Sequence, residues 1–154
     1  MRKRDIALSL AIALAAAPAI AVLLSSCASQ NVPDSHLTVH CTENLTGVDV
    51  TNGGVAGTGH CTLTGALHDS GPDTDYRTQT PEVITIRKVI TGAKGTITLV
   101  IKIPQVGGGG EQFTVTSGTG AYAKLHGHGL QVVDNYQATP ATFVLKGTVS
   151  HAQA

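Results

Sequence analysis

Residues 81–104 read PEVITIRKVITGAKGTITLVIKIP, two runs rich in Ile, Val and Thr on either side of a short turn segment. β-Branched residues favour extended strands, and two such runs joined by a few glycine-containing residues are typical of a hairpin. A turn between Gly92 and Gly95 sets Ile90 opposite Ile97. The stretch therefore predicts a long antiparallel hairpin.

This hairpin has one aliphatic face and one mixed face, because side chains alternate along a strand. The aliphatic face carries Ile84, Ile86, Ile90, Ile97, Leu99, Ile101 and Ile103. Such asymmetry favours an antiparallel sheet with one dry side and one wet side. A slip of one residue would expose all of these side chains, so we expect a firmly set register.

Lys88 interrupts the aliphatic face, between Ile86 and Ile90. A lysine is almost never fully buried without a partner. Two interpretations follow: Lys88 reaches solvent at the rim of the sheet, with or without a β-bulge, or it lines a cavity and points at a polar group.

The rest of the chain repeats the pattern of short β-prone runs separated by Gly, Asn, Asp and Pro. We expect strands near 37–47, 56–68, 82–90, 96–103, 111–116, 126–133 and 141–150. Residues 70–81 and 106–111 read as loops, and Ala121–Leu125 as one helical turn. The predicted fold is all-β, a small antiparallel barrel of about seven or eight strands.

The N-terminus has the pattern of an export signal, with basic residues at positions 2–4 and an almost wholly apolar run over 6–24. Leu24-Ser25-Ser26-Cys27 resembles the lipobox of bacterial lipoproteins, in which the cysteine becomes the lipidated first residue. We therefore expect lipidation at Cys27 and a lipid anchor in the bacterial cell envelope. Plain secretion and an uncleaved anchor helix are the alternatives.

Cleavage before Cys27 divides the chain into three parts: a signal peptide over 1–26, a polar tether over 27–36 and a barrel domain over 37–154. The cleaved segment takes three of the ten Lys and Arg residues and one of the ten Asp and Glu residues. The mature chain is then mildly acidic with no basic stripe, which argues against nucleic acid as a partner.

Cys41 and Cys61 form an even pair in an oxidising compartment, which favours a disulfide closing a loop of about twenty residues. One feature opposes the pairing. Asn52-Gly53 invites a two-residue hairpin turn, which would set Cys41 opposite Thr64. A disulfide then needs an odd-length loop, a bulge or strands that are not simple neighbours.

His126 and His128 share a strand face by their spacing, and with His40 or His60 they are candidates for zinc or copper. No third ligand is fixed by the sequence, so we assign no metal and no cofactor. We group these two histidines with Lys88 as candidates to line a cavity.

Residues 116–130, TSGTGAYAKLHGHGL, are similar to a stretch of dirigent proteins and allene oxide cyclases. The matching residues are Gly118, Thr119, Gly120, Tyr122 and Gly127. Exported actinobacterial proteins of the allene-oxide-cyclase-like barrel class resemble the chain more widely, over about 56–149. The resemblance implies a calycin-type barrel in which a turn after Gly120 lets Tyr122 and Leu125 plug one end. It implies no catalytic residue here, because the shared residues are those of turns and packing.

Three functions are compatible with these features. The first is a non-catalytic envelope lipoprotein that binds a small apolar ligand or an envelope partner. The second is a cyclase or isomerase acting on an apolar substrate in the barrel, and the third is a purely structural surface protein. The state of the barrel interior separates them: a filled interior favours the third, an aliphatic cavity the first, and a cavity with Lys88 or a carboxylate the second.

Overall fold

The computed structural model describes residues 35–46 and 51–152. The expected signal peptide and the lipobox cysteine, Cys27, lie outside the described residues. Among the described residues, no helix is long and apolar enough to cross a membrane.

Eight antiparallel strands and one short helix make up the described chain. They are β1 (Ser35–Leu45), β2 (Asn52–Gly65), β3 (Asp69–Gln79), β4 (Val83–Gly92), β5 (Gly95–Pro104), β6 (Gln112–Gly118), the 3₁₀ helix η1 (Gly120–Tyr122), β7 (Leu125–Asn135) and β8 (Ala141–His151). β1 begins two residues before the expected start of the barrel domain at residue 37.

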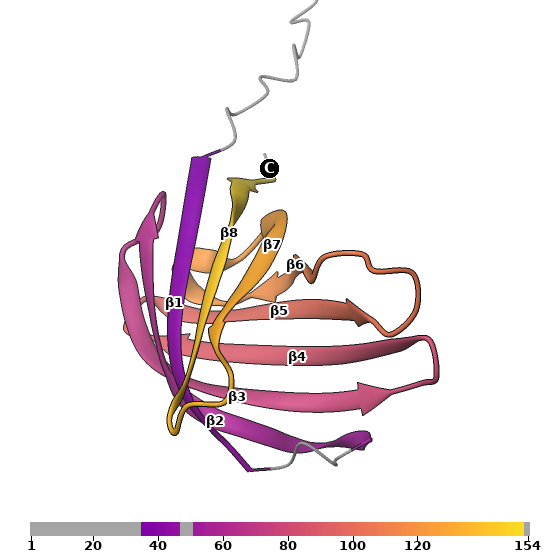
Figure 1. The fold of residues 1–154 in the computed structure, drawn as a ribbon. Helices are drawn as coiled ribbons and strands as arrows, with labels where there is room; N and C mark the ends of the chain where they lie inside the picture. Colours follow the sequence, from indigo (N-terminus) through magenta and orange to yellow (C-terminus); the bar gives the residue numbers. More distant parts are fainter. Residues whose placement is uncertain (1–34, 47–50, 153–154) are drawn as a thin grey trace, which may run out of the picture. The chain divides into compact units, whose positions relative to one another are not determined.

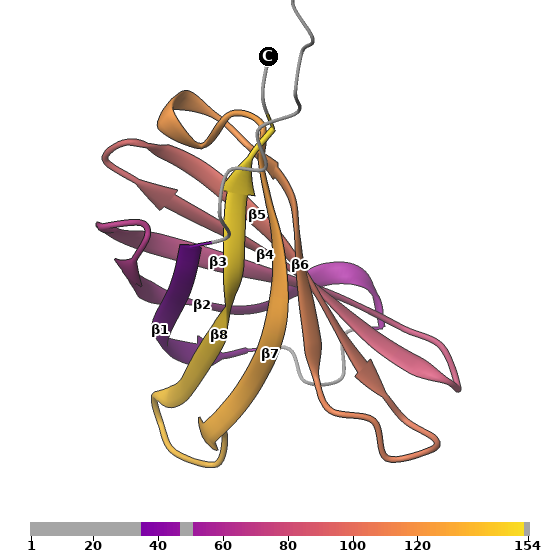
Figure 2. The same ribbon diagram turned by 90° about the horizontal axis from the view of Figure 1, so that it is seen from above.

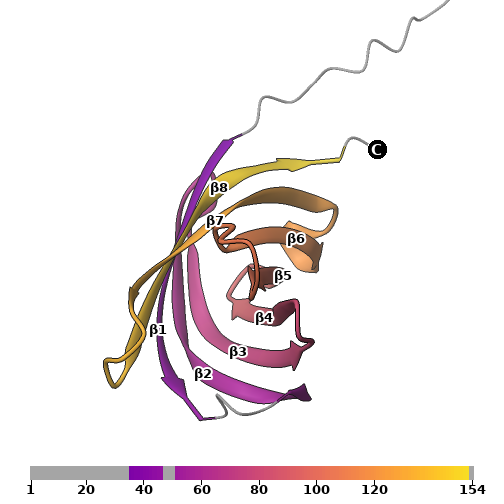
Figure 3. The same ribbon diagram turned by 45° about the vertical axis from the view of Figure 1, so that its right-hand side comes forward.

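The strands form a closed barrel in sequence order, because β8 pairs with β1 as well as with β7. β1, β8 and β7 lie side by side on one wall and cross β3, β4 and β5 on the facing wall (Figures 1 and 2). Figure 3 shows how strongly the strands curve around their common centre. Each of the described strands therefore pairs with a neighbour on both sides, so none of them is an edge strand.

The predicted 81–104 hairpin is confirmed as β4 and β5. Ile90 pairs with Ile97 and Ile86 with Ile101. The aliphatic face points into the barrel, where Ile90, Ile97 and Ile101 are buried. The expected loop over 106–111 is also found, between β5 and β6.

The expectation of a loop over 70–81 is wrong, because most of this segment is β3. Its residues pair with β2 on one side and with β4 on the other. The inward positions carry Gly71, Asp73, Asp75 and Arg77 rather than aliphatic residues. The segment therefore lacks the hydrophobic alternation that marks the other strands.

One end of the barrel is filled with apolar side chains, and we call it the closed end. Its fill includes Leu37, Leu63, Ile90, Ile97, Tyr122, Leu125 and Val149. The Tyr122 hydroxyl donates a 2.7 Å hydrogen bond to Asp69, which also accepts from the backbone amides of Ala93 and Lys94. The β2–β3 connection, the β4–β5 turn and η1 are thereby tied together.

The glycines at η1 fit the plugging turn that the resemblance implies. Gly120 opens η1 with φ +59°, and a Cβ there would lie 2.3 Å from the Lys94 carbonyl oxygen. A Cβ at Gly118 would lie 2.2 Å from the Tyr122 carbonyl oxygen, and one at Gly127 would lie 2.3 Å from that of Thr148. The space at these three positions admits only glycine.

Cys41 and Cys61 form a disulfide between β1 and β2. The two cysteines are direct partners in the register, and Thr64 instead faces Thr38. Asn52-Gly53 does not form the turn between these strands. It lies at the start of β2, where β-bulges shift the pairing with β3.

Candidate functional site

Lys88 lies inside the barrel with 1% of its side chain exposed, so the rim interpretation is wrong. Its ammonium group donates hydrogen bonds to Glu43, to Asp73 Oδ2 at 3.0 Å and to Asp75 Oδ2 at 3.0 Å. β4 pairs regularly with both neighbours, with no bulge that would turn Lys88 outward. The partner that a buried lysine requires is thus a set of three carboxyl groups.

The register of three strands brings this charge cluster together. Glu43 is two residues from the inward-facing Cys41 on β1, so both side chains enter the barrel. Asp73 and Asp75 share the inward face of β3, and Asp75 pairs with Lys88. Gly59 on β2 makes room for Glu43, since a Cβ there would lie 2.8 Å from the Glu43 Cγ.

Burial and neighbouring charges shift the pKa values of Glu43, Asp75 and Lys88 in opposite directions. Burial raises the pKa of Glu43 to about 8, more than the nearby Lys88 ammonium lowers it. Burial also raises the pKa of Asp75, which lies within hydrogen-bonding reach of Glu43. Burial alone would lower the pKa of Lys88, but the carboxylates outweigh it and raise that pKa. At neutral pH the lysine is therefore charged while Glu43 holds a proton.

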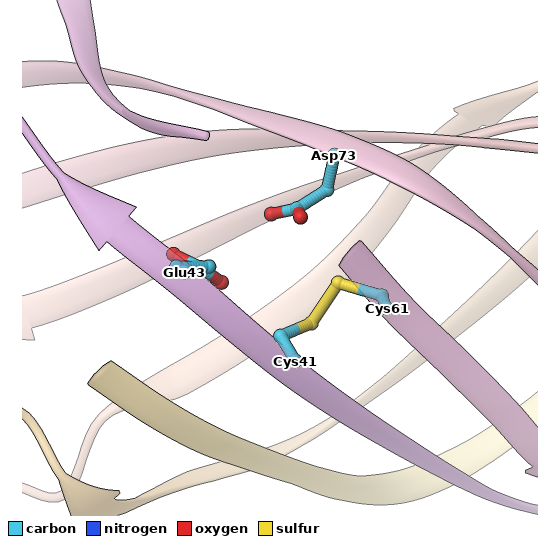
Figure 4. Close-up of side chains that lie close together, drawn as sticks. All are labelled: Cys41, Glu43, Cys61 and Asp73. Atoms are coloured by element: carbon cyan, nitrogen blue, oxygen red, sulfur yellow. A yellow bond between two sulfur atoms is a disulfide. The ribbon is translucent and has the colours of Figure 1, made fainter. Parts of the chain in front are cut away.

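The disulfide forms one side of the cluster. Figure 4 shows Glu43 and Asp73 beside the bond between Cys41 and Cys61. The two sulfur atoms and one oxygen of each carboxyl group lie within 4.8 Å of one another. As a disulfide, the two cysteines supply no thiolate to a metal. They hold β1 and β2 together at the level of the charge cluster.

Beyond the cluster, toward the end of the barrel opposite the closed end, lies a cavity of about 550 Å³. The cavity is lined by Leu45, Ala56, Asp75, Arg77, Ile84, Ile86, Ile101, Ile103, Gln105, Glu111, Gln131, Val133, Tyr136 and Phe143. Leu45 and Tyr136 are exposed, so this end communicates with solvent, and we call it the mouth. The volume lies within the range of small-molecule sites.

Asp75 connects the cavity to the charge cluster. It lines the cavity with 10% of its side chain exposed, whereas the Glu43 and Asp73 side chains are fully buried. Arg77, two residues nearer the mouth, donates to Gln79 at 2.7 Å, and its Nε is buried without a hydrogen-bond partner. The cavity thus has aliphatic walls with a carboxyl group and a guanidinium group at defined positions.

Two further polar residues at the mouth form a pair. Glu111 accepts a 2.6 Å hydrogen bond from the Gln131 side chain, and both residues line the cavity. Glu82 is exposed in the β3–β4 turn and lines no part of this cavity.

The prediction that His126 and His128 line the cavity is wrong. Both are exposed on the outer surface of β7, where His126 contacts Ser150 at 2.8 Å. Their i, i+2 spacing places them on one face, but inward positions on β7 belong to residues such as Leu125 and Gly127. His40 and His60 are exposed on β1 and β2, and β8 separates these strands from β7. The structure does not bring the two histidine pairs together.

Sequence reasoning found Lys88 and the disulfide but missed Glu43, Asp73 and Asp75. A signal for them exists. Glu43 follows Cys41 by two positions, and the acids of DTD at 73–75 share one strand face. A buried lysine on an inward face needs an acidic partner. Asp73 and Asp75 have the i, i+2 spacing that places two side chains on the same face of a strand.

No protein-family model matches the chain, and no curated protein matches its sequence. The barrel itself defines the class: a closed eight-stranded antiparallel β-barrel of calycin-like architecture, closed at one end and hollow at the other. A charged layer of three acids and one lysine separates the two halves.

Proposed function

We propose that this protein binds a small, mainly apolar ligand in the hollow half of its barrel. The observation that carries the proposal is the cavity of about 550 Å³, whose walls are largely aliphatic and aromatic and whose floor includes Asp75. Sites of this kind bind through apolar contact and orient the ligand with a few polar groups.

A purely structural role fits this interior less well. Side chains can fill an eight-stranded barrel completely, as they do at the closed end. The hollow half leaves Ile84, Ile86 and Ile103 only partly buried. Unfilled apolar surface inside a closed barrel gains stability from an apolar occupant, which supports binding.

The site of action that we propose is the bacterial cell envelope, with the chain exported and held by lipid on Cys27. Support comes from the sequence pattern of residues 1–27. Two or three acyl chains would hold the protein firmly, because each buried methylene adds roughly 0.8 kcal/mol of membrane affinity. Metabolic labelling with a palmitate analogue, compared between wild type and Cys27→Ala, tests this part of the proposal.

A cyclase or isomerase of the allene-oxide-cyclase-like or dirigent-like type is the second candidate. One observation favours it: Asp75 lines the cavity and belongs to a cluster in which burial raises carboxyl pKa values toward neutrality. Such a carboxyl group can exchange a proton with a substrate at physiological pH. Turnover of an apolar epoxide that disappears in Asp75→Asn, with binding retained, would select this candidate.

Native mass spectrometry of protein purified from its own host tests the binding proposal. We expect a small molecule to co-purify with wild type. Ile103→Trp places a larger side chain in the cavity and should reduce the bound fraction. Val100→Trp adds the same ring to the outer face of β5 and serves as the matched control. A molecule retained equally by both variants, or absent from wild type and from both, would contradict the proposal.

A further inference from the structure

The charge cluster contains more acceptors than the chain can satisfy. Lys88 has three ammonium hydrogens, and it donates to Glu43, Asp73 and Asp75. Glu43 Oε2, Asp73 Oδ1 and Asp75 Oδ1 are buried without a hydrogen-bond partner. Asp75 Oδ1 lies 2.9 Å from the Lys88 Nζ, but the ammonium hydrogen bond goes to Oδ2. The Glu43 proton can serve as a donor between Glu43 and Asp75. A buried acceptor without a donor is unfavourable, so the remaining oxygens favour an additional donor.

The cluster also carries an excess of negative charge. Three carboxyl groups face one ammonium group, so its formal charge is −2 when every group is ionised. Toward the mouth, Arg77 and Glu111 add one charge of each sign and leave the excess unchanged. Low-dielectric walls concentrate this field within the cavity. A proton on Glu43 offsets part of the excess, and a cation entering the cavity could do the same.

Of the three acids in the cluster, Asp75 is the one that can meet a ligand, through the 10% of its side chain that is exposed, although its Oδ1 is buried. Asp75 lines the cavity, whereas Glu43 and Asp73 do not. A donor that enters from the mouth therefore passes aliphatic walls and reaches Asp75 at the floor. Arg77 lies nearer the mouth and is more exposed, so water screens its repulsion of a cation more effectively.

We infer that the cavity selects ligands with an apolar body and a protonated amine, the ammonium group pairing with Asp75. The inference rests on the proposed function and specifies the ligand class for the same site. An ammonium supplies both features that the cluster lacks, a hydrogen-bond donor and a positive charge. Ammonium binding and protonation of the Glu43–Asp75 pair then compete, so the amine expels a proton.

Decylamine, decanol and decanoate share one chain length and differ in their head groups, so they test this inference as probes. Isothermal titration calorimetry of wild type at pH 8 should give an affinity for decylamine about tenfold or more above that for decanol, and weakest binding for decanoate. Repeating the titration in buffers of different ionisation enthalpy should reveal proton release with decylamine but not with decanol.

The pH dependence gives a second readout that requires no variant. The titratable and charged groups that face the site are Glu43, Asp73, Asp75, Glu111, Lys88 and Arg77. Lowering the pH from 8 to 5 protonates Glu43 and favours the neutral form of Asp75, because burial raises the pKa of both. Decylamine should then lose its advantage over decanol. A decylamine affinity that does not change over this range would overturn the inference.

Asp75→Asn keeps the shape of the side chain and should bring the decylamine and decanol affinities within about twofold of each other. Glu82→Gln removes a carboxylate that lines no part of the cavity and should leave the preference intact. Equal binding of all three probes to wild type, or tightest binding of decanoate, overturns the amine inference alone. Failure of all three probes to bind overturns the proposed function with it.

Discussion

Replacement of Lys88 by Met tests the charge cluster most directly. The variant keeps a side chain of similar length but leaves Glu43, Asp73 and Asp75 buried without their cation. Removing one partner of a buried ion pair costs about 3–5 kcal/mol. Small domains have a free energy of unfolding of about 5–15 kcal/mol, so the loss at pH 8 is a large part of the total.

The loss should depend on pH with a defined sign. Burial raises the pKa values of Glu43 and Asp75 above those of the unfolded chain, and loss of the Lys88 ammonium, which lowers both, raises them further. A raised folded pKa contributes stability that is present below the unfolded value and is lost as the pH rises through the folded value. Each carboxyl group that keeps its proton only when folded changes the free energy of unfolding by about 1.4 kcal/mol per pH unit. Glu43 and Asp75 together give a slope of roughly 3 kcal/mol per pH unit at most.

Urea unfolding followed by far-ultraviolet circular dichroism at pH 5 and pH 8 measures both effects. The free energy of unfolding of a small protein falls by about 2 kcal/mol per molar urea, so the unfolding midpoint of the variant should lie roughly 2 M below that of wild type at pH 8. Most of this difference should disappear at pH 5. Lys102→Met, on the exposed face of β5, is the matched control and should change little at either pH. A Lys88→Met midpoint equal to that of the control at pH 8, or a loss of equal size at both pH values, would refute the reasoning.

Three further predictions concern stability. Gly120→Val should destabilise the barrel by a few kcal/mol, because a side chain at φ +59° is strained and meets the Lys94 carbonyl; an unchanged thermal midpoint would contradict this. Reduction of the Cys41–Cys61 disulfide should cost about 3 kcal/mol for its loop of twenty residues, measured by urea unfolding with and without reductant, and a loss near zero would show that the chain retains its constraint without the bond. Wild type should lose stability as the pH rises from 4.5 to about 8, where the unfolded chain releases the Glu43 proton and the folded chain keeps it; Glu43→Gln should flatten this slope, and equal slopes would exclude the pKa assigned to Glu43.

The all-β fold and the central hairpin could be predicted because β4 and β5 alternate aliphatic and polar residues with a period of two. β3 could not be predicted from the same signal. Its inward residues Asp73, Asp75 and Arg77 are charged, so the strand resembles a polar loop until its partner Lys88 is known. Alternation of aliphatic and polar residues indicates a strand whose inward side chains pack against apolar neighbours. The inward side chains of β3 instead contact charged groups.

The candidate site shows the same limit. Lys88 stood out because it interrupted an aliphatic face, and the expectation that it points at polar groups is met by three carboxyl groups, although Lys88 is not among the residues that line the cavity. The cavity itself depends on which barrel end is filled, and this is a tertiary property: Tyr122 closes one end, whereas among the described residues no comparable side chain fills the other. The cysteine register also required the whole barrel, because Asn52-Gly53 favours a local turn that the pairing of β2 with β3 overrides.

The described chain starts and finishes at the pole opposite the cavity entrance. β1 starts, and β8 finishes, beside η1 at the plugged pole. A linkage made next to Ser35 or His151 would therefore leave the entrance unobstructed, so exchange of a bound molecule can be followed on immobilised protein.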